Sequence, residues 1–402
     1  MHAQVKTLLH HESIELSRSP YAAPVIFVTK KTGEMRMVFD YRALNSIIVK
    51  SRYPLPRIED IFDKLAGSKF FSCLDLQQGY HPIRIPDSDR EKTAFRTPMG
   101  LYQFKVLTFG LTNGPAPFQA EMNRILEPVL SVCVVFLDDI CIHSMTLSDH
   151  LLHLEMVFKI LRKEKLFSKF SKCTFAVHEL KFLGHIIGQD GIKVDPAKIS
   201  VIKNWPISTC MSEVRSFLGL ANYFRKFVLG FSTLVAPLTS LTSANTPWNW
   251  CCKCQVAFDT VISMLINAPL LQLPDFEKPF KIISDASLVG TGAVLLQEDK
   301  PIAFTSSKFI PAERGYTTTE QELLGVIRAL QAWRCYVEGG KFPVLLVTDH
   351  NPLTFLRSQS TFSRRQARWV EYLERFHYEW KYIQGTSMLR IPCPVYLLYS
   401  CH

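Results

Sequence analysis

Adjacent carboxylates stand out at Asp138 and Asp139, inside the apolar stretch 136–140, where no Gly or Asn favours a tight two-residue turn. An isolated Asp-Asp pair is usually a solvated turn. A third acid, Asp75, follows the apolar run 70–74, and strand ends in one sheet can bring such acids together. Because clustered carboxylates without a basic partner repel one another, we expect these three to hold divalent metal ions.

Two divalent ions held by such acids suit phosphoryl transfer, because one lowers the pKa of an attacking hydroxyl while the other stabilises the leaving oxygen. The substrate would then be a nucleotide on a growing strand. Lys30 and Arg36 lie on or beside a predicted basic hairpin, where Arg offers a planar fork and Lys a mobile charge for a triphosphate. Taken singly, either cation is more typical of a solvated loop, and the acids are what favour nucleotide binding.

A second set of acids lies near the C-terminus. Asp285 and Asp349 end predicted strands, and Glu322 lies on the helix predicted between them. Glu322 comes just before the apolar residues of that helix, so we expect its carboxylate at the edge of the sheet rather than fully in solvent.

The composition favours a globular protein of two or three domains with a polyanionic partner such as nucleic acid, since the net charge over 402 residues is +10. The apolar runs are too short to span a bilayer, and residues 1–19 do not form a signal peptide. The 11 cysteines are mostly scattered, which favours a reducing, intracellular compartment, cytoplasmic or nuclear. Cys251, Cys252 and Cys254 are expected to be thiols in a surface segment, because no second pair lies at zinc-finger spacing.

Periodicity predicts a mixed α and β first half and a second α/β unit after a connecting region. A break is expected near 204–206, before a helical stretch at 212–227. The predicted strands are 25–29, 35–39, 70–74 and a hairpin within 132–142, then 280–284, 292–296, 302–306 and 343–348, with helices at 148–165 and 319–333. Three strands, a helix and a returning strand are typical of an α/β domain of about a hundred residues.

Five segments, in order and spacing, resemble the blocks of a reverse transcriptase, most closely the pol protein of gypsy-type LTR retrotransposons. They are Ser19–Val25, Val38–Asn45, Leu74–His81, Thr108–Asn113 and Phe136–Asp139. The resemblance implies an α+β multidomain chain: a right-hand polymerase of fingers, palm and thumb, a connection segment and an α/β RNase H-like domain. The implied limits are 1–145 for fingers and palm, 146–205 for the thumb-like region with the primer grip, 206–272 for the connection and 273–402 for the RNase H-like domain.

The resemblance also implies roles for single residues. Asp75, Asp138 and Asp139 match the polymerase metal ligands, and Tyr80 matches the aromatic gate that rejects a 2′-hydroxyl. The other matches are Lys30 and Arg36 for the triphosphate, Phe109 and Gly110 for the floor of the nucleotide pocket, and Phe182, Leu183, Gly184 and His185 for the grip on the primer terminus.

Asp285, Glu322 and Asp349 resemble the acids of RNase H, whose metal-activated water cuts the RNA strand of an RNA–DNA hybrid. The implied protein is an RNA-directed DNA polymerase with an attached RNase H. It would use Mg²⁺, or Mn²⁺, together with deoxynucleoside triphosphates, an RNA template and a DNA primer. No pattern in the sequence indicates an oligomer interface.

Two departures from the family pattern bear on activity. Pro82 stands where the family has Gln and removes a backbone donor beside the sugar gate. Pro392 stands where the family has a fourth RNase H acid, so we expect weaker RNase H than polymerase activity. A catalytically impaired, nucleic-acid-binding relic is therefore the alternative, and an RNA-templated RNA polymerase is disfavoured by Tyr80 and by the RNase H acids. The C-terminal departure is typical of a fragment of a longer polyprotein.

Overall fold

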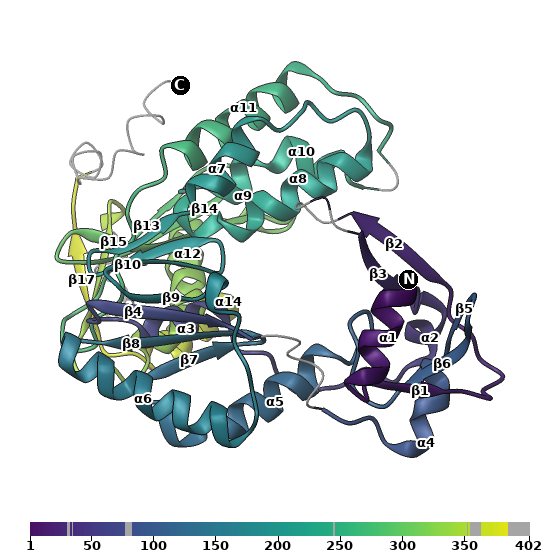
Figure 1. The fold of residues 1–402 in the computed structure, drawn as a ribbon. Coiled ribbons are helices and arrows are strands. Elements are labelled where there is room, and N and C mark those ends of the chain that lie inside the picture. Colours follow the sequence, from purple (N-terminus) through teal and green to yellow (C-terminus); the bar gives the residue numbers. More distant parts are fainter. Residues whose placement is uncertain are drawn as a thin grey trace. The chain divides into compact units, whose positions relative to one another are not determined.

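The computed structural model describes residues 1–29, 33, 35–76, 83–243, 246–351, 353 and 363–384. It divides into two compact units, Met1–Leu180 and Lys181–His402. Each unit has its own helices and sheets (Figure 1). No helix in the described part of the chain is both long and apolar enough to cross a membrane.

The N-terminal part of the first unit has an aromatic core between two small sheets. β2 (Val25–Thr29) pairs antiparallel with β3 (Met35–Phe39), which confirms the predicted hairpin. The second sheet has the order β1-β6-β5. Its strands are β1 (Ile14–Leu16), β6 (Gly100–Phe104) and β5 (Phe95–Thr97), accompanied by α1 (His2–His10), α2 (Arg42–Ile47) and α4 (Asp87–Arg90). The rings of Phe39, Phe95 and Phe104 lie 4.5–5.2 Å apart and stabilise this core.

The rest of the first unit is a four-stranded sheet in the order β7-β8-β4-β9, with helices packed on it. The strands are β7 (Cys133–Phe136), β8 (Asp139–Ser144), β4 (Phe70–Asp75) and β9 (Thr174–Val177). α5 (Pro115–Leu126) and α6 (Leu147–Lys163) share one apolar core with alternate residues of the strands, and α3 (Ile58–Lys64) also contacts β7. The helix predicted at 148–165 is confirmed; it begins one residue earlier because the Thr146 side chain caps it, and it ends at Lys163.

The second unit begins within a small sheet, β10-β11-β12, and continues into helices. Its elements are β10 (Glu179–Phe182), β11 (His185–Gly188), β12 (Gly191–Val194), α7 (Pro196–Lys203), α8 (Met211–Tyr223), α9 (Phe231–Leu234), α10 (Ala236–Ser240) and α11 (Cys252–Ile266). The expected break at 204–206 follows α7. The prediction of surface thiols holds for Cys251 and Cys252 but is wrong for Cys254, which is 3% exposed because it lies on the buried face of α11.

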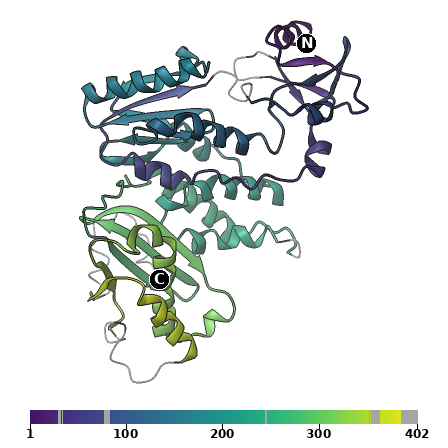
Figure 2. The same ribbon diagram turned by 90° about the horizontal axis from the view of Figure 1, so that it is seen from below.

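The C-terminal part of the second unit is a five-stranded sheet in the order β15-β14-β13-β16-β17 (Figure 2). The antiparallel strands are β13 (Lys281–Ala286), β14 (Gly290–Gln297) and β15 (Lys300–Lys308), and β16 (Val344–Thr348) and β17 (Tyr378–Tyr382) are parallel to β13. α12 (Thr318–Ala332) connects β15 to β16, with α13 (Arg334–Val337) after it and α14 (Arg364–Leu373) before β17. The predicted three strands, helix and returning strand are therefore confirmed.

Candidate active sites

The first candidate site lies where the hairpin β7–β8 meets β4. The strand register places Asp75 directly opposite Asp139, with Asp138 in the turn beside it. The Leu76 amide also donates to the Asp138 carbonyl at 3.1 Å, which ties β4 to the turn. All three acids are half-buried. The backbone thus presents three carboxylates from two chain segments at one end of the sheet.

Gln119 on α5 holds this turn in place. Its side chain is fully buried, its Oε1 accepts from the Leu137 amide at 2.7 Å, and its Nε2 donates to the Val135 carbonyl at 3.1 Å. Leu137 has a φ of 53°, a conformation that costs a non-glycine residue energy unless its surroundings impose it. The two hydrogen bonds from Gln119 supply that constraint and so position Asp138 and Asp139.

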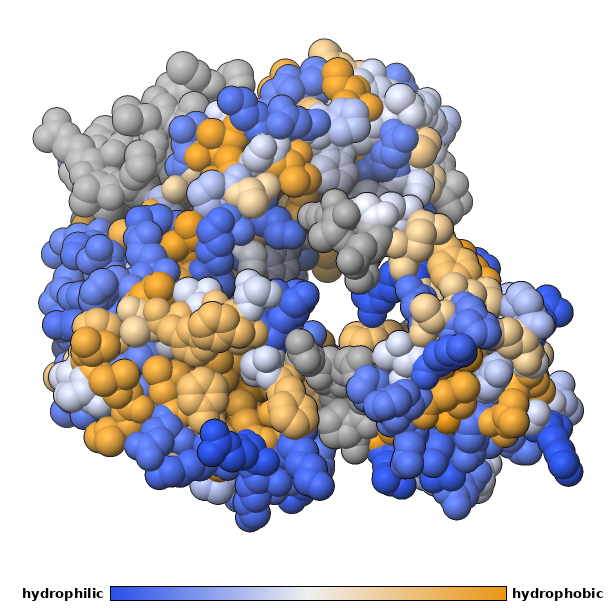
Figure 3. Space-filling view, viewed as in Figure 1, coloured by the Kyte–Doolittle hydropathy of each residue, from blue (hydrophilic) through white to orange (hydrophobic). Residues whose placement is uncertain are grey.

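A lysine contacts the first acid cluster, contrary to the expectation that the acids have no basic partner. Lys172 Nζ lies 2.9 and 3.1 Å from the two carboxylate oxygens of Asp75. The short turn that carries Lys172 is anchored by Phe170, whose ring stacks on Phe175 at 5.8 Å. Figure 3 shows apolar side chains gathered on the visible face of this unit. Phe158 and Phe170 are among the large hydrophobic residues that this unit exposes.

Charge repulsion remains strong in the cluster despite Lys172. Burial, followed by repulsion from Asp138 and Asp75, raises the pKa of Asp139 to about 6, with Lys172 opposing the rise. A carboxylate whose pKa is raised by neighbouring carboxylates suits a divalent cation, which removes the repulsion. The oxygens of the three acids do not gather within 4.8 Å of one another, in contrast to those of the second site described below.

Three of the five predicted nucleotide-binding residues lie in the described part of the first unit, and Lys30 and Tyr80 lie outside it, as does Pro82. The Arg36 guanidinium lies 4.9 Å from the centre of the Phe109 ring, a cation–π contact across 73 positions of sequence. Gly110 has a φ of 101°, and Asn45 donates from Nδ2 to its carbonyl at 2.8 Å. Asn45, which the sequence does not single out, thereby fixes the loop beside Arg36.

The residues predicted for the primer grip form the β10–β11 turn. Leu183 and Gly184 both have positive φ, and the Leu183 carbonyl accepts from the Tyr223 hydroxyl and from His185 Nδ1, each at 2.7 Å. Phe182 and His185 are buried. Burial, with a smaller effect of Lys226, lowers the pKa of His185 to about 4, so the imidazole is neutral near pH 7.

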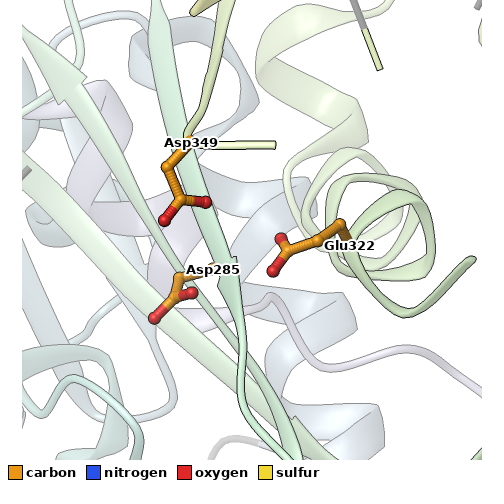
Figure 4. Close-up of side chains that lie close together, drawn as sticks. All are labelled: Asp285, Glu322 and Asp349. Atoms are coloured by element: carbon orange, nitrogen blue, oxygen red, sulfur yellow. The ribbon is translucent and has the colours of Figure 1, made fainter. Parts of the chain in front are cut away.

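The second candidate site is the group Asp285, Glu322 and Asp349. Each offers a carboxylate oxygen, and these oxygens lie within 4.8 Å of one another. Figure 4 shows Glu322 extending from its helix toward the two aspartates at the strand ends. Gly325, one turn after Glu322, permits this approach, because a Cβ there would lie 2.7 Å from Ser284 Oγ on β13.

Proton uptake, rather than a lysine, relieves the charge of this second group. Burial, followed by repulsion from Asp285 and Asp349, raises the pKa of Glu322 to about 8. Asp285 is exposed at the surface, yet desolvation of its carboxylate, followed by repulsion from Asp349, raises its pKa as well. Glu322 Oε1 accepts from the Ala286 amide at 3.2 Å, and no donor among the described residues reaches the buried Oε2. A buried oxygen without a donor beside two further carboxylates fits a divalent metal ion.

Comparisons with known proteins agree with this two-site arrangement. Residues 28–187 match the family described as reverse transcriptase (RNA-dependent DNA polymerase), and residues 275–376 match the RNase H-like domain found in reverse transcriptase. The first acid cluster lies in the first match, and the second cluster lies in the second match.

Individual relatives cover nearly the whole chain. The retrovirus-related Pol polyprotein from transposon 297 of Drosophila melanogaster is 39% identical over 96% of this chain, which spans 37% of that relative. The foamy viral protease-reverse transcriptase dRH in complex with ds DNA is 28% identical, with a TM-score of 0.83, over 94% of this chain and 68% of that one. The foamy viral protease-reverse transcriptase in complex with RNA/DNA hybrid is 27% identical, with a TM-score of 0.77, over 95% of this chain and 52% of that one.

Proposed function

We propose that this chain, which belongs to the reverse transcriptase family and also carries an RNase H-like domain, is an RNA-directed DNA polymerase with an attached RNase H, as in a retrotransposon pol region. The observation that carries the proposal is that one chain contains two separate clusters of acids. One cluster lies in the match to the reverse transcriptase family and the other in the match to the RNase H-like domain, and both activities use acids to hold metal ions. We keep the proposed limits of 1–145 for fingers and palm, 146–205 for the thumb-like region, 206–272 for the connection and 273–402 for the RNase H-like domain.

In the polymerase site, Asp75, Asp138 and Asp139 would hold divalent ions, and hard oxygen ligands favour Mg²⁺, with Mn²⁺ as a substitute. When bound, two such ions lower the pKa of the attacking 3′-hydroxyl and stabilise the leaving pyrophosphate oxygen. Arg36, held over Phe109, presents its planar guanidinium to the triphosphate. Asn45 keeps the Gly110 loop rigid beside it.

In the RNase H site, Asp285, Glu322 and Asp349 would hold the ion beside the scissile phosphate of the RNA strand. Glu322 must lose its proton for this, because only the carboxylate is a strong ligand, so metal binding releases a proton there. The Ala286 amide fixes Oε1, which leaves Oε2 available to the ion. The position of the family's fourth acid, Pro392, lies outside the described residues, and we retain weaker RNase H than polymerase activity as a proposal.

The proposed partners are an RNA template, a DNA primer, deoxynucleoside triphosphates and an RNA–DNA hybrid. The net charge of +10 and the complexes of the foamy viral proteins with ds DNA and RNA/DNA hybrid support this. Phosphate binding releases counterions, so the affinity for a hybrid should fall steeply as salt is raised. Affinity that does not change with salt would contradict a nucleic-acid groove.

The deciding experiment is metal-dependent incorporation of deoxythymidine on poly(rA)·oligo(dT). We expect incorporation by the natural chain and none by Asp138→Asn, with both proteins binding the hybrid equally. Binding without incorporation by the natural chain would instead support the second candidate, an impaired nucleic-acid-binding relic, which Pro82 and Pro392 favour.

A further inference from the structure

A pair of cysteine thiols lies at the start of α11, a helix that carries none of the acids of either cluster. Cys251 is the N-cap residue of this 15-residue helix, and Cys254 lies one turn later. Their sulfur atoms are 3.7 Å apart, close to van der Waals contact. Cys251 is exposed, whereas Cys254 is 3% exposed. One accessible and one buried thiol therefore face each other at a helix N-terminus.

The two thiols differ in acidity as well as exposure. The Cys254 amide, then the Cys254 thiol and the Lys253 amide, lower the pKa of Cys251 by hydrogen bonding to its sulfur. Burial raises the pKa of Cys254. Cys251 is thus suited to attack, because its thiolate is both stabilised and accessible, and Cys254 is suited to resolve the product.

We propose that Cys251 and Cys254 are a reversible redox dithiol that exchanges with small disulfides of the glutathione class. The Cys251 thiolate attacks one sulfur of glutathione disulfide, which forms a mixed disulfide and releases one glutathione thiolate that takes up a proton. Cys254 then loses its proton and attacks the Cys251 sulfur, which releases the second glutathione. Two protein thiols are oxidised to one disulfide while one glutathione disulfide is reduced to two glutathiones.

Other cysteines in the described part of the chain lack this combination. Cys73 and Cys141 are cross-strand neighbours in β4 and β8, but Cys141 is fully buried and burial raises the pKa of both thiols. They should therefore react slowly although they lie opposite each other.

The proposed disulfide would change the packing between α10 and α11. Cys254 Sγ lies 3.9 Å from the Pro237 carbonyl, a second acceptor within reach of its single S–H in the reduced protein. That proton is lost on oxidation. Trp250, next to Cys251, donates to Gln255 on the same helix and stacks edge-on against Phe258 at 5.8 Å. Its fluorescence should report the change.

The test treats the full chain with glutathione disulfide and maps the products by differential alkylation and mass spectrometry. We expect a Cys251–Cys254 disulfide that dithiothreitol reverses. Cys254→Ser should stop at one glutathione attached to Cys251, and Cys251→Ser should lose exchange at this site by about tenfold or more, because the accessible thiolate is gone.

Cys252→Ser is the matched control, since it removes an exposed thiol from the same turn and should change neither product nor rate. Circular dichroism of each variant checks that it folds. A disulfide mapped to Cys252 or between two chains, or equal reactivity of natural and Cys251→Ser proteins, would overturn the proposal.

Discussion

The two acid clusters differ in how their negative charge is held. In the proposed polymerase site the carboxylates are half-buried, and Lys172 pairs with Asp75. In the proposed RNase H site the carboxylate oxygens lie within 4.8 Å, and the pKa of the buried Glu322 is raised to about 8. One site therefore balances its negative charge with a lysine and the other with a proton, so a metal ion must displace a different cation at each site.

The supports of the two sites also differ. A buried glutamine holds a strained turn in the first site, whereas in the second a glycine lets a helix lie against a strand. The hairpin turn depends on a few hydrogen bonds, while the helix–sheet contact is part of a large apolar core. The polymerase site should therefore be the more sensitive to single polar substitutions.

The largest expected effects come from reciprocal acid substitutions. Asp139→Asn should lower nucleotide incorporation by about a thousandfold or more, because loss of a metal ligand removes several kcal/mol of transition-state stabilisation. Asp285→Asn should do the same to RNA cleavage. Each variant is the control for the other, and both activities are measured on one labelled hybrid. If either substitution abolished both activities, the two clusters would not be separate sites.

The proton in the RNase H site predicts a pH-dependent stability in EDTA. Glu322 has a folded-state pKa of about 8, above its ordinary value of 4.5, so its protonation stabilises the fold below pH 4.5 and that stabilisation is lost as pH rises through about 8. Glu322→Gln keeps a neutral side chain at every pH. Relative to the natural protein, the variant should be similar at pH 4.5 and more stable at pH 9, by on the order of a few kcal/mol.

The measurement is urea unfolding of both proteins across this pH range. Glu371→Gln, at an exposed position of α14, is the control and should not change the pH profile. Adding Mg²⁺ should stabilise the natural protein more than the variant. Equal pH profiles for natural protein and Glu322→Gln would show that the carboxylate is not buried as described.

Sequence patterns predict the elements of both sites better than their supports. The strands at 25–29 and 35–39 follow from short apolar runs on either side of a charged turn that contains Gly, and the order Asp, Glu, Asp singles out the three acids whose oxygens lie within 4.8 Å of one another. Lys172 could not be predicted, because it meets Asp75 only through a fold that joins positions 97 residues apart. Gln119 did leave a signal, a polar residue beside Phe118 on the buried face of α5. Gly325 left no signal, because a glycine within a helix does not by itself indicate close packing against a strand, here at Ser284.

Gln119 provides a prediction of intermediate size. Gln119→Leu leaves the Leu137 amide and the Val135 carbonyl buried without their partner, which should cost about 1–3 kcal/mol of unfolding free energy. Polymerase activity should fall by more than the loss of folded protein accounts for, while RNA cleavage stays the same. Glu121→Gln, on the exposed side of α5, is the matched control. Equal losses of both activities would mean that Gln119 supports the fold and not the turn.

The smallest expected effect concerns Lys172. Its ion pair with Asp75 is partly exposed, with side-chain exposures of 57% and 26%, so Lys172→Gln should change stability by less than about 1 kcal/mol. The same substitution removes the cation that a metal ion must displace. Metal binding at the polymerase site should therefore strengthen, by up to about fivefold for 1 kcal/mol.

Mn²⁺ binding, followed by electron paramagnetic resonance, separates this effect from any change in rate. The Asp285→Asn background weakens binding at the RNase H site, so that the polymerase site dominates the titration. Lys169→Gln removes one positive charge from the same segment, where Lys169 contacts Asp75 through its backbone amide, and should leave the affinity nearly unchanged. Tighter binding in Lys172→Gln but not in Lys169→Gln would show that the lysine occupies the place of the metal ion. Unchanged or weaker Mn²⁺ binding would show that breaking the Asp75–Lys172 ion pair costs no free energy. Lys172 would then not be the cation that balances the charge of this site.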